Sequence, residues 1–419
     1  MGTLVLSSPQ ELFLAPPSRA EPSLPARRQP DEIAVPPSAE ARGFVGESTP
    51  APGGRGLRVI IAGGGTGGHL FPGVALAEEI RRQGGEVLFV GTERGIEARV
   101  IPEQGYALRK IDATGIKGRG IGGLVRGVLR LPRAWWQCRA IVKEFAPDVV
   151  VGVGGYASGP LVATAATMMI PTAIMEQNSI PGITNRILGR LARRVFATFP
   201  DPKGYFPAKK IILTGNPIRR QLLASLQDEA GAAAGEHPPR LFVFGGSQGA
   251  RAINDAMLQA APILLERLPT LEIWHQTGQA DEARVREGYA SLGLGEPRAR
   301  VSAFIKAMAE PYQWSDVVLC RAGATSLAEL SAVGRPAVLV PFPHATDNHQ
   351  EFNARALVDA GAALLLRESE WSPTKVAEAL AGLLGDRGRL EAMRRAMIAA
   401  ARPDAAAHIY SELLGLVRR

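Results

Sequence analysis

Three glycine-rich segments carry the clearest chemical signal in the chain, because each follows an apolar run and precedes a stretch with helical spacing. They are 63–69, 154–160 and 245–250, and we call them the first, second and third glycine loops. Backbone N–H groups in such a loop approach an anion closely, at the positive end of a helix dipole. The loops therefore predict phosphate binding, and several of them around one cleft would suit two substrates that both carry diphosphates. A tight turn that needs glycine only for its backbone angles is the alternative, above all for the second loop.

The first loop also fits the dinucleotide-binding pattern, because its glycines are spaced as Gly63-x-Gly65-x-x-Gly68. Glu93, near the end of the next apolar run, is then the candidate partner for a ribose. This pattern alone favours a nicotinamide-dependent oxidoreductase. His69 at the end of the loop and the two further glycine loops count against that function, which remains an alternative.

A fourth segment, Cys320–Glu329, follows an apolar run and begins a helix whose first turn carries Thr325 and Ser326. Phosphate or hydroxyl groups of a ligand can dock at such a helix start. Glu329, about one turn into the helix, either accepts hydrogen bonds from a ribose diol or is a solvated charge on the helix surface.

The sequence predicts no metal and no cofactor. It has no Asp-x-Asp pair of the kind that holds a Mg²⁺-bound diphosphate. His344, Asp347 and His349 lie close together, but no further strong ligand stands at a recognisable spacing, so we interpret them as one face of a loop. We expect helix ends, Ser247 and arginines to balance the charge of a diphosphate.

Strands and helices must position these loops, and the sequence contains one such unit twice. An apolar run at 57–62 leads through the first loop into a helical pattern, and a run at 240–244 leads through the third loop in the same way about 180 residues later. Further runs predict strands at 86–90, 148–153, 172–176, 272–275, 316–320 and 337–340. Strands that alternate with helices predict two Rossmann-like, doubly wound α/β domains that face a cleft, with ligands at the carboxyl ends of the strands.

Size and composition agree with two such domains. The chain has 419 residues, of which 46% are hydrophobic and 21% charged, which excludes a disordered or fibrous protein. Residues 1–56 hold ten of the 32 prolines and no periodicity, so we predict a disordered extension. Two distant cysteines, Cys138 and Cys320, argue against a disulfide framework or a zinc ribbon. The uncharged run 149–175 is long enough to cross a bilayer, but its glycines and prolines favour a strand, a turn, a helix and a second strand.

The net charge of +8 is concentrated in one segment, since residues 106–143 hold nine basic side chains and one acidic side chain. A helix over 119–136 would place apolar side chains on one side and arginines on the other. The residues that mark these two sides are Leu124, Val128, Trp135 and Trp136, and Arg126, Arg130 and Arg133. Such a helix suits an anionic membrane surface, and an ordinary packed helix with a solvated basic face is the alternative. We expect no nucleic-acid partner, because the chain has no DNA- or RNA-binding motif.

In combination, the motifs resemble those of the MurG family of bacterial peptidoglycan synthesis, the UDP-N-acetylglucosamine:N-acetylmuramyl-(pentapeptide) pyrophosphoryl-undecaprenol N-acetylglucosaminyltransferases. The motifs are the three glycine loops, Glu176-Gln177-Asn178, Gly215-Asn216-Pro217-Ile218-Arg219 and Trp274-His275-Gln276. The resemblance runs from about Leu57 to the end of the chain and implies a GT-B glycosyltransferase. Its members move N-acetylglucosamine from UDP-N-acetylglucosamine to the 4-hydroxyl of the muramyl sugar of lipid I, which yields lipid II and UDP with inversion to a β linkage.

The resemblance also implies domain roles and a location. Residues 57–219 would bind the acceptor and the membrane, with 404–419 crossing back onto them, and residues 220–403 would bind the UDP-sugar, with a hinge near Arg219. The partners would be UDP-N-acetylglucosamine, lipid I and an anionic membrane surface. The enzyme would be peripheral, at the cytoplasmic face of the bacterial plasma (inner) membrane.

Site residues follow from the same resemblance. Uracil would meet the backbone of Ile305, the ribose would meet Glu329, the diphosphate would meet Ser247 and the helix start at Ala324, and the sugar would meet Asn178 and Gln350. The full implied donor set is Thr66, Gly67, Gly68, Asn178, Arg219, Ser247, Ile305, Ala324, Thr325, Ser326, Leu327, Ala328, Glu329 and Gln350. The acceptor diphosphate would lie at the second loop, at Gly154, Gly155, Tyr156 and Ser158.

An inverting transfer needs a group that takes the proton of the acceptor hydroxyl. His69 is the candidate base, because imidazole titrates near neutrality and the first loop faces the cleft. The alternative is a histidine that only positions the loop or a substrate phosphate. Three other functions stay open at this point: a UDP-N-acetylglucosamine epimerase with the same fold and donor, the nicotinamide-dependent oxidoreductase, and a non-catalytic scaffold of wall synthesis.

Overall fold

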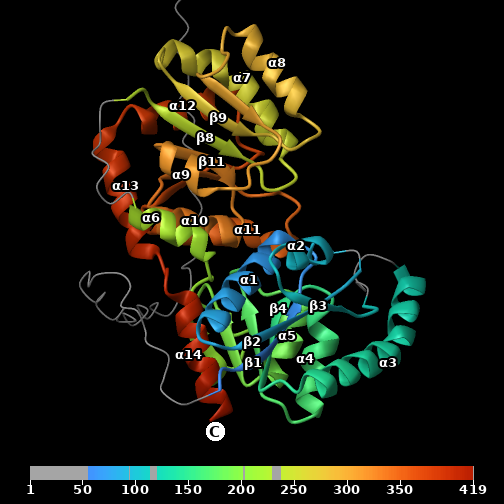
Figure 1. Ribbon diagram of the computed structural model, residues 1–419. Helices are drawn as coiled ribbons and strands as arrows, with labels where there is room; N and C mark the ends of the chain where they lie inside the picture. Colours follow the sequence, from blue (N-terminus) through green and yellow to red (C-terminus); the bar gives the residue numbers. More distant parts are fainter. Residues whose placement is uncertain (1–54, 94, 114–119, 202, 229–236, 419) are drawn as a thin grey trace, which may run out of the picture. The chain divides into compact units, whose positions relative to one another are not determined.

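Two parallel β-sheets, each covered by helices on both faces, organise the chain in the computed structural model (Figure 1). The structure describes residues 55–93, 95–113, 120–201, 203–228 and 237–418, and it leaves the side chains of 120–131 and 226–228 undescribed. We call each sheet with the helices packed on it the first half and the second half. The two sheets confirm the predicted pair of doubly wound α/β units. The extension predicted at 1–56 falls almost entirely outside the described residues.

The first sheet has seven parallel strands in the order β3-β2-β1-β4-β5-β6-β7. Its strands are β1 (Arg58–Gly63), β2 (Glu86–Gly91), β3 (Ala107–Lys110), β4 (Val149–Gly154), β5 (Thr172–Glu176), β6 (Arg194–Ala197) and β7 (Ile211–Leu213). Its helices are α1 (Gly67–Arg82), α2 (Glu97–Glu103), α3 (Gly120–Phe145), α4 (Ser158–Thr167) and α5 (Ile183–Leu191), and a 3-10 turn spans Ala208–Lys210.

Alternation along β1 shows why both faces of this sheet must be covered. Val59 and Ile61 enter one hydrophobic core, which α1 completes, while Ile60 and Ala62 enter the other, which α3, α4 and α5 complete. A strand that is apolar at every position is stable only between two layers of helices. The carboxyl end of β1 is thereby held in register with that of β4, and the first and second glycine loops begin there.

The second sheet has six parallel strands in the order β10-β9-β8-β11-β12-β13. Its strands are β8 (Arg240–Phe244), β9 (Glu272–Gln276), β10 (Ala299–Ser302), β11 (Val317–Arg321), β12 (Ala337–Val340) and β13 (Ala363–Leu365). The remaining helices before the last one are α6 (Arg220–Asp228), α7 (Arg251–Arg267), α8 (Glu282–Ser291), α9 (Ala309–Trp314), α10 (Ala324–Val333), α11 (His349–Asp359), α12 (Pro373–Leu384) and α13 (Arg387–Ala400), with a 3-10 turn at Thr346–Asn348.

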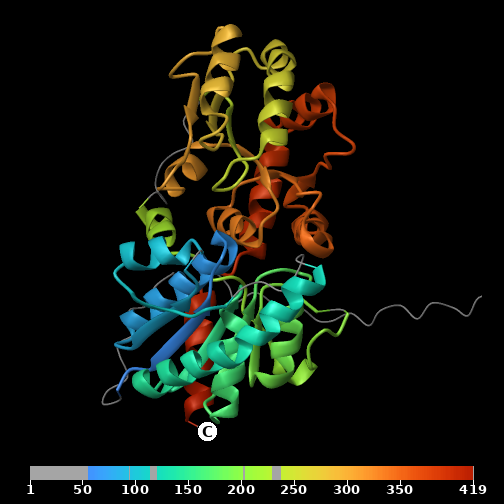
Figure 2. The same cartoon turned by 90° about the vertical axis from the view of Figure 1, so that its right-hand side faces the viewer.

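The last helix, α14 (Ala405–Val417), packs on the first half although the chain reaches it from the second (Figures 1 and 2). It lies against α1, and Ile409, Leu413 and Leu416 are buried in the same core as β1. The chain therefore passes between the halves twice, once near Arg219 and once before α14.

The predicted strands are confirmed to within two residues at their ends, and five shorter ones went unpredicted. The unpredicted strands are β3, β6, β7, β10 and β13, of three or four residues each. The run at 149–175 forms β4, α4 and β5, as its glycines and prolines predict. Within the described residues, no helix is long and apolar enough to cross a membrane. The helix predicted at 119–136 exists but is longer, since α3 continues to Phe145.

We expect Leu413→Ala to lower the free energy of unfolding by about 3 kcal/mol, because it opens a cavity in the first core. Leu413 is 0% exposed, whereas Leu213 on β7 is 52% exposed, so Leu213→Ala should cost less than about 1 kcal/mol. Urea titration of both variants checks this. Equal losses would contradict the assignment of α14 to this core.

Candidate functional site

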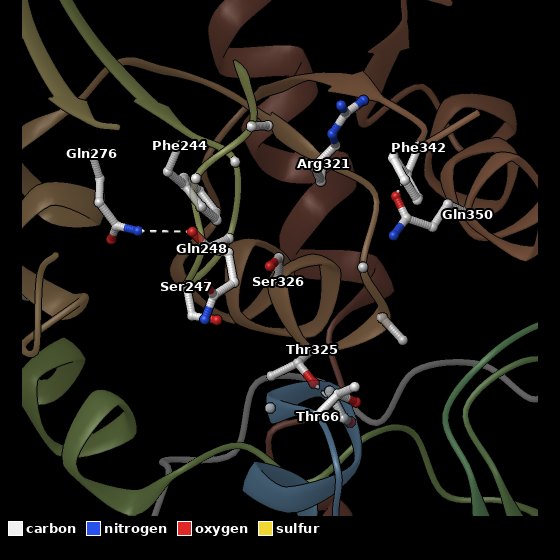
Figure 3. A pocket seen from close by; sticks show the side chains of 18 of the residues that line it. Thr66, Phe244, Ser247, Gln248, Gln276, Arg321, Thr325, Ser326, Phe342 and Gln350 are labelled. Carbon is white, nitrogen blue, oxygen red and sulfur yellow. Dashed lines mark hydrogen bonds between the residues drawn. The ribbon is translucent and has the colours of Figure 1, made fainter. Parts of the chain in front are cut away.

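A cavity of about 980 Å³ lies between the two halves, and its walls come from both. The first half contributes the start of α1 and residues after β5, and the second half contributes the starts of α7, α10 and α11 (Figure 3). Figure 3 shows Thr66 beside Thr325, where the start of α1 meets the start of α10. A cavity of this size accommodates a ligand with several rings and charged groups.

Helices α1, α7 and α10 are among those that begin at this cavity without a side-chain cap. The N-cap residues Thr66 of α1, Ala250 of α7 and Gly323 of α10 all line the cavity or directly precede lining residues, and none accepts a capping hydrogen bond with its side chain. The first N–H groups of a helix have no partner within the helix. The cavity therefore presents the positive ends of these helices to a bound anion.

The first glycine loop has already paired part of its backbone internally. The Gly64 N–H donates to the carbonyl oxygen of Gly154 at 3.2 Å, and the Gly65 N–H donates to Oε2 of Glu97 at 2.8 Å. The buried Glu97 carboxylate also accepts from the backbone N–H and the hydroxyl of Thr92. A phosphate at this loop must therefore bind at Gly67 and Gly68, where α1 begins, and not at Gly64 and Gly65.

These contacts argue against a nicotinamide dinucleotide. In the fingerprint that binds one, the glycine turn lets the backbone approach the pyrophosphate, and an acidic residue holds the ribose. Here Glu97 occupies the loop amide, and Glu93, the predicted ribose partner, is exposed and is not part of the cavity wall. The glycine spacing alone could not reveal this, because Glu97 lies 32 residues further along the chain.

The first and second glycine loops pack directly on one another. Gly155 has φ = +81°, and a Cβ atom there would lie 2.3 Å from the carbonyl oxygen of Gly64, so glycine is required. The four predicted acceptor residues of the second loop do not form part of the cavity wall. Tyr156 is exposed, and Ser158 is buried at the start of α4 with no hydrogen-bond partner for its hydroxyl among the described residues.

His69 lies at the cavity wall, half-buried at the start of α1. Its Nδ1 atom is 3.0 Å from Oε1 of Gln177, the residue that follows β5. The neighbouring residue Glu176 is also buried, and burial raises the pKa of its carboxyl group, while hydrogen bonds from Asn178 and Asn185 and the nearby His69 oppose that rise. Within the Glu176-Gln177-Asn178 motif, Gln177 contacts His69, and Gln177 and Asn178 line the cavity.

Glu329 lies at the cavity wall, and each of its two carboxyl oxygens has a hydrogen-bond partner. Its Oε1 accepts from Arg219 at 3.3 Å, and its Oε2 accepts from the hydroxyl of Tyr312 at 3.1 Å. Burial raises the pKa of Glu329, and the Arg219 charge opposes the rise. The Arg219 guanidinium also stacks on Phe71 of α1, and its Nε–H is buried without a partner among the described residues.

Two asparagines and a threonine connect the halves beside the cavity. Asn353 of α11 donates to Oδ1 of Asn178 at 3.2 Å and accepts from the N–H of Ser179 at 2.8 Å. Thr325 of α10 donates to the carbonyl oxygen of Gly68 at 3.3 Å. These contacts bring Asn178 and the start of α1 to the edge of the second half's site.

The third glycine loop is held by the end of β9. A Cβ atom at Gly249, where φ is +74°, would lie 1.9 Å from the carbonyl oxygen of Thr277. Gln276 donates to the carbonyl oxygen of Gly246 at 3.0 Å, as Figure 3 shows, and its Oε1 accepts from the N–H of Ile305 at 3.4 Å. Behind the loop, burial lowers the pKa of His275 to about 3, so this histidine is neutral and shares hydrogen bonds with Tyr289 and Asn254.

The structure brings most of the predicted donor residues to one cavity. Those in its wall are Thr66, Gly67, Gly68, Asn178, Arg219, Ser247, Ile305, Ala324, Thr325, Ser326, Glu329 and Gln350. Leu327 and Ala328 are not in the wall, and Leu327 is buried in the second half's core because a helix turns its side chain inward there. Gln350 accepts from the N–H of Phe342 at 3.0 Å, which fixes its amide at the cavity (Figure 3).

The loop with His344, Asp347 and His349 forms no metal site in the described part of the chain. Asp347 pairs with Arg186 of α5 at 3.2 Å, and His349 contacts the carbonyl oxygen of Thr346. No group of three or more potential ligands occurs among the described residues.

Of the predicted membrane residues, only Arg133, Trp135 and Trp136 have described side chains. Arg133 and Trp136 are exposed. The ring of Trp135 contacts the ring of Trp136 and the guanidinium group of Arg139. The side chains of Leu124, Arg126, Val128 and Arg130 lie outside the described residues, although their backbone belongs to α3.

Sequence reasoning did not identify the residues whose hydrogen bonds fix the loops and segments that line this site. Glu97, Gln276 and Asn353 act on backbone groups or side chains far away in the sequence. Nothing in the local pattern marks Glu97 or Asn353, and the motif that contains Gln276 does not reveal its role, since each contact depends on how two segments meet in space.

Comparisons with known proteins agree with this geometry. The Glycosyltransferase family 28 N-terminal domain matches residues 59–197, and the Glycosyltransferase family 28 C-terminal domain matches residues 240–409. A Myxococcus xanthus (strain DK1622) protein is 49% identical over 352 residues, which cover 84% of this chain and 90% of that protein. A Geobacter sulfurreducens protein is 46% identical over 365 residues, 87% of this chain and 100% of that protein. Both are described as UDP-N-acetylglucosamine--N-acetylmuramyl-(pentapeptide) pyrophosphoryl-undecaprenol N-acetylglucosamine transferase.

A solved structure gives the same result. The crystal structure of Acinetobacter baumannii MurG superposes with a TM-score of 0.70 at 31% sequence identity, and the match covers 86% of this chain and 99% of that one.

We expect Glu97→Leu to lower the free energy of unfolding by about 3 kcal/mol or more, because three hydrogen-bond donors lose their buried acceptor. Glu93→Leu is the matched control, since Glu93 is exposed in the same segment. Chemical denaturation of the two variants measures the difference. If both lose the same amount, Glu97 does not hold the first loop.

Proposed function

Because the chain belongs to the MurG family within glycosyltransferase family 28, we propose that it transfers N-acetylglucosamine from UDP-N-acetylglucosamine to lipid I, giving lipid II and UDP. The observation that carries this function is the cavity at which α1, α7 and α10 begin without a side-chain cap beside the buried Glu329 carboxylate. Positive helix ends suit a diphosphate, and a buried carboxylate suits the hydroxyl groups of a ribose.

The donor fits the second half's side of this cavity. Glu329 holds the ribose, and the backbone of Ile305, which Gln276 holds in place, meets the uracil. Ser247 and the start of α10 at Ala324 meet the diphosphate, together with the unpartnered Nε–H of Arg219. Asn178 and Gln350 meet the sugar, and both are already oriented by hydrogen bonds.

The acceptor fits the first half, which we take as residues 57–219 with 404–419, while residues 220–403 form the donor-binding domain. The start of α1 at Gly67 and Gly68 and the start of α4 in the second loop both offer helix N–H groups to the lipid diphosphate. Both diphosphates then bind without a metal, because helix ends and Arg219 balance their charge. We place the hinge near Arg219, which contacts both halves.

Transfer with inversion proceeds in one displacement. The 4-hydroxyl oxygen of the muramyl sugar forms a bond to the anomeric carbon as the bond from that carbon to the UDP oxygen breaks, and the bonding electrons leave with UDP. His69 takes the hydroxyl proton, and the N–H groups at the third loop and at α10 stabilise the departing diphosphate.

A lipid-facing surface on the first half completes the proposal. Helices α3, α4 and α5 form one layer, with α4 between the other two. Five large exposed apolar side chains belong to this layer or to the turn after α4, namely Trp136, Met169, Ile183, Ile187 and Leu191. Exposed Arg133 and Arg190 accompany them, which favours anionic lipid and a peripheral position at the cytoplasmic face of the bacterial inner membrane.

We expect UDP release only when both UDP-N-acetylglucosamine and a lipid I analogue are present. We also expect His69→Ala to lower turnover by about 10²-fold or more, because it removes the base. A coupled assay for UDP measures both. Formation of the manno epimer from the nucleotide sugar alone would indicate an epimerase instead, and membrane binding without UDP release would indicate a scaffold. Near wild-type turnover of His69→Ala would remove His69 from the role of base.

We expect Ile187→Glu to weaken binding to vesicles that contain anionic lipid by about 5-fold or more, because it removes apolar contact and adds like charge. Ile398→Glu is the control, because Ile398 on α13 is 49% exposed and Ile187 is 55% exposed. Sedimentation with vesicles compares the two. Equal affinities would exclude α5 from the lipid-facing surface.

A further inference from the structure

Gln177 connects His69 to the backbone of the first sheet through both atoms of its amide group. Its Oε1 lies 3.0 Å from Nδ1 of His69, and its Nε2 donates to the carbonyl oxygen of Val153 at 3.2 Å. Gln177 is 2% exposed, so its amide group is almost fully buried. The amide therefore forms a continuous chain from β4 to the imidazole ring.

The carbonyl oxygen of Val153 sets the direction of this chain. A carbonyl only accepts, so the atom of Gln177 that faces it must be the amide nitrogen, and the atom that faces His69 must be the amide oxygen. An amide oxygen also only accepts, so Nδ1 of His69 must carry a proton. In the neutral ring the lone pair is then on Nε2, for which the structure gives no partner among the described residues.

We propose that Gln177 is a positioning residue that holds neutral His69 in the Nδ1–H tautomer, so that Nε2 is the atom that takes the proton of the acceptor hydroxyl. The role of His69 as a base in this inference rests on the proposed function. The tautomer of His69 does not, because it can be measured in the free protein. The proton moves from the hydroxyl to Nε2 as the new glycosidic bond forms, and the Nδ1–H bond to Gln177 stays in place through the step. Gln177 gains and loses no proton.

Packing of the second glycine loop restricts the ring as well. A Cβ atom at Gly154 would lie 2.7 Å from Nδ1 of His69, so the ring sits directly on the backbone of this loop. The ring is thus held by contact on one side and by a hydrogen bond at one nitrogen. A base needs this type of restraint, because its lone pair must point along one direction.

Several charged or titratable groups lie on the elements around His69. Glu176 is adjacent to Gln177 on β5, Glu97 contacts the first loop, and Tyr156 belongs to the second loop. Arg219 stacks on Phe71 of α1 and pairs with Glu329 of α10. Among these, Glu176 is the group whose own pKa responds to His69, although its carboxylate oxygens are bonded to Asn178 and Asn185. Gln177 is therefore the direct hydrogen-bond contact of the His69 ring.

The first experiment measures the tautomer directly in the wild-type protein, with all histidines labelled with ¹⁵N. His69→Ala identifies the His69 signals by their loss, at a pH where the ring is neutral. We expect the nitrogen shifts of the Nδ1–H form in the wild type. A neutral His69 in the Nε2–H form would overturn the inference, and this result would not depend on turnover.

The second experiment compares Gln177→Met, Gln177→Glu and the control Gln313→Leu. Gln313 is a half-buried glutamine that donates to the carbonyl oxygen of Ser225, outside the cavity wall. We expect Gln177→Met to lower kcat by about 10-fold or more with KM for UDP-N-acetylglucosamine changed by less than about 2-fold. Gln177→Glu should move the acidic limb of the pH–rate profile to higher pH by about one unit, because a carboxylate stabilises the imidazolium. The control should keep the wild-type profile.

The outcomes separate this inference from the proposed function. If the wild type releases no UDP with a lipid I analogue, the proposed function fails, while the tautomer measurement still decides the role of Gln177. If the wild type is active but Gln177→Glu keeps the wild-type pH profile, the positioning role fails. A Gln177→Met protein that loses thermal stability but keeps the Nδ1–H tautomer would show a structural role only, and would also overturn the inference.

Discussion

Unpaired N–H groups at the starts of helices are the constraint around which this site is arranged. In a parallel α/β unit the carboxyl end of each strand leads into the start of the next helix, so these starts collect along one edge of each sheet. Helices α1, α7 and α10 bring their uncapped starts to one cavity. If side chains of the protein capped these helices, fewer N–H groups would be free to bind a ligand. In the free protein these N–H groups have no side-chain cap, and a bound anion would supply their hydrogen-bond acceptor.

The chain nevertheless satisfies the donors that a ligand does not reach. Glu97 accepts from Gly65, and Gly154 accepts from Gly64, so these two N–H groups of the first loop are already paired in the free protein. In the third loop, Gln276 at the end of β9 donates to the carbonyl oxygen of Gly246, and the neutral His275 behind the loop bonds to Asn254 of α7. Around the cavity, Arg219 and Tyr312 hold the Glu329 carboxylate, which burial alone would make unfavourable as a charge. Preformed geometry of this type lowers the cost of ordering side chains when a substrate binds.

Local patterns in the sequence predicted the fold class, most of the central strands and the glycine loops, because those features depend on neighbours in the chain. The strands β3, β6, β7, β10 and β13 were missed, since runs of three or four residues give too short a pattern. At α10 the whole run 324–329 was assigned to the site, but a helix turns about 100° per residue. Thr325, Ser326 and Glu329 therefore reach the cavity while Leu327 enters the core. The contacts of Glu97 and Gln177 depend on which segments of the first half become neighbours, and those of Asn353 depend on how the two halves meet.

The central claim is that helix ends and Arg219, without a metal, bind the diphosphate of a uridine nucleotide at the cavity between the two halves. Isothermal titration of the full chain with UDP, UMP and uridine in the presence of EDTA tests it most directly. The account predicts that UDP binds at least about 10-fold more tightly than UMP, because the second phosphate gains charge-assisted hydrogen bonds from the backbone and Arg219. Equal affinities for UDP and UMP, or UDP binding that appears only when Mg²⁺ is added, would contradict it.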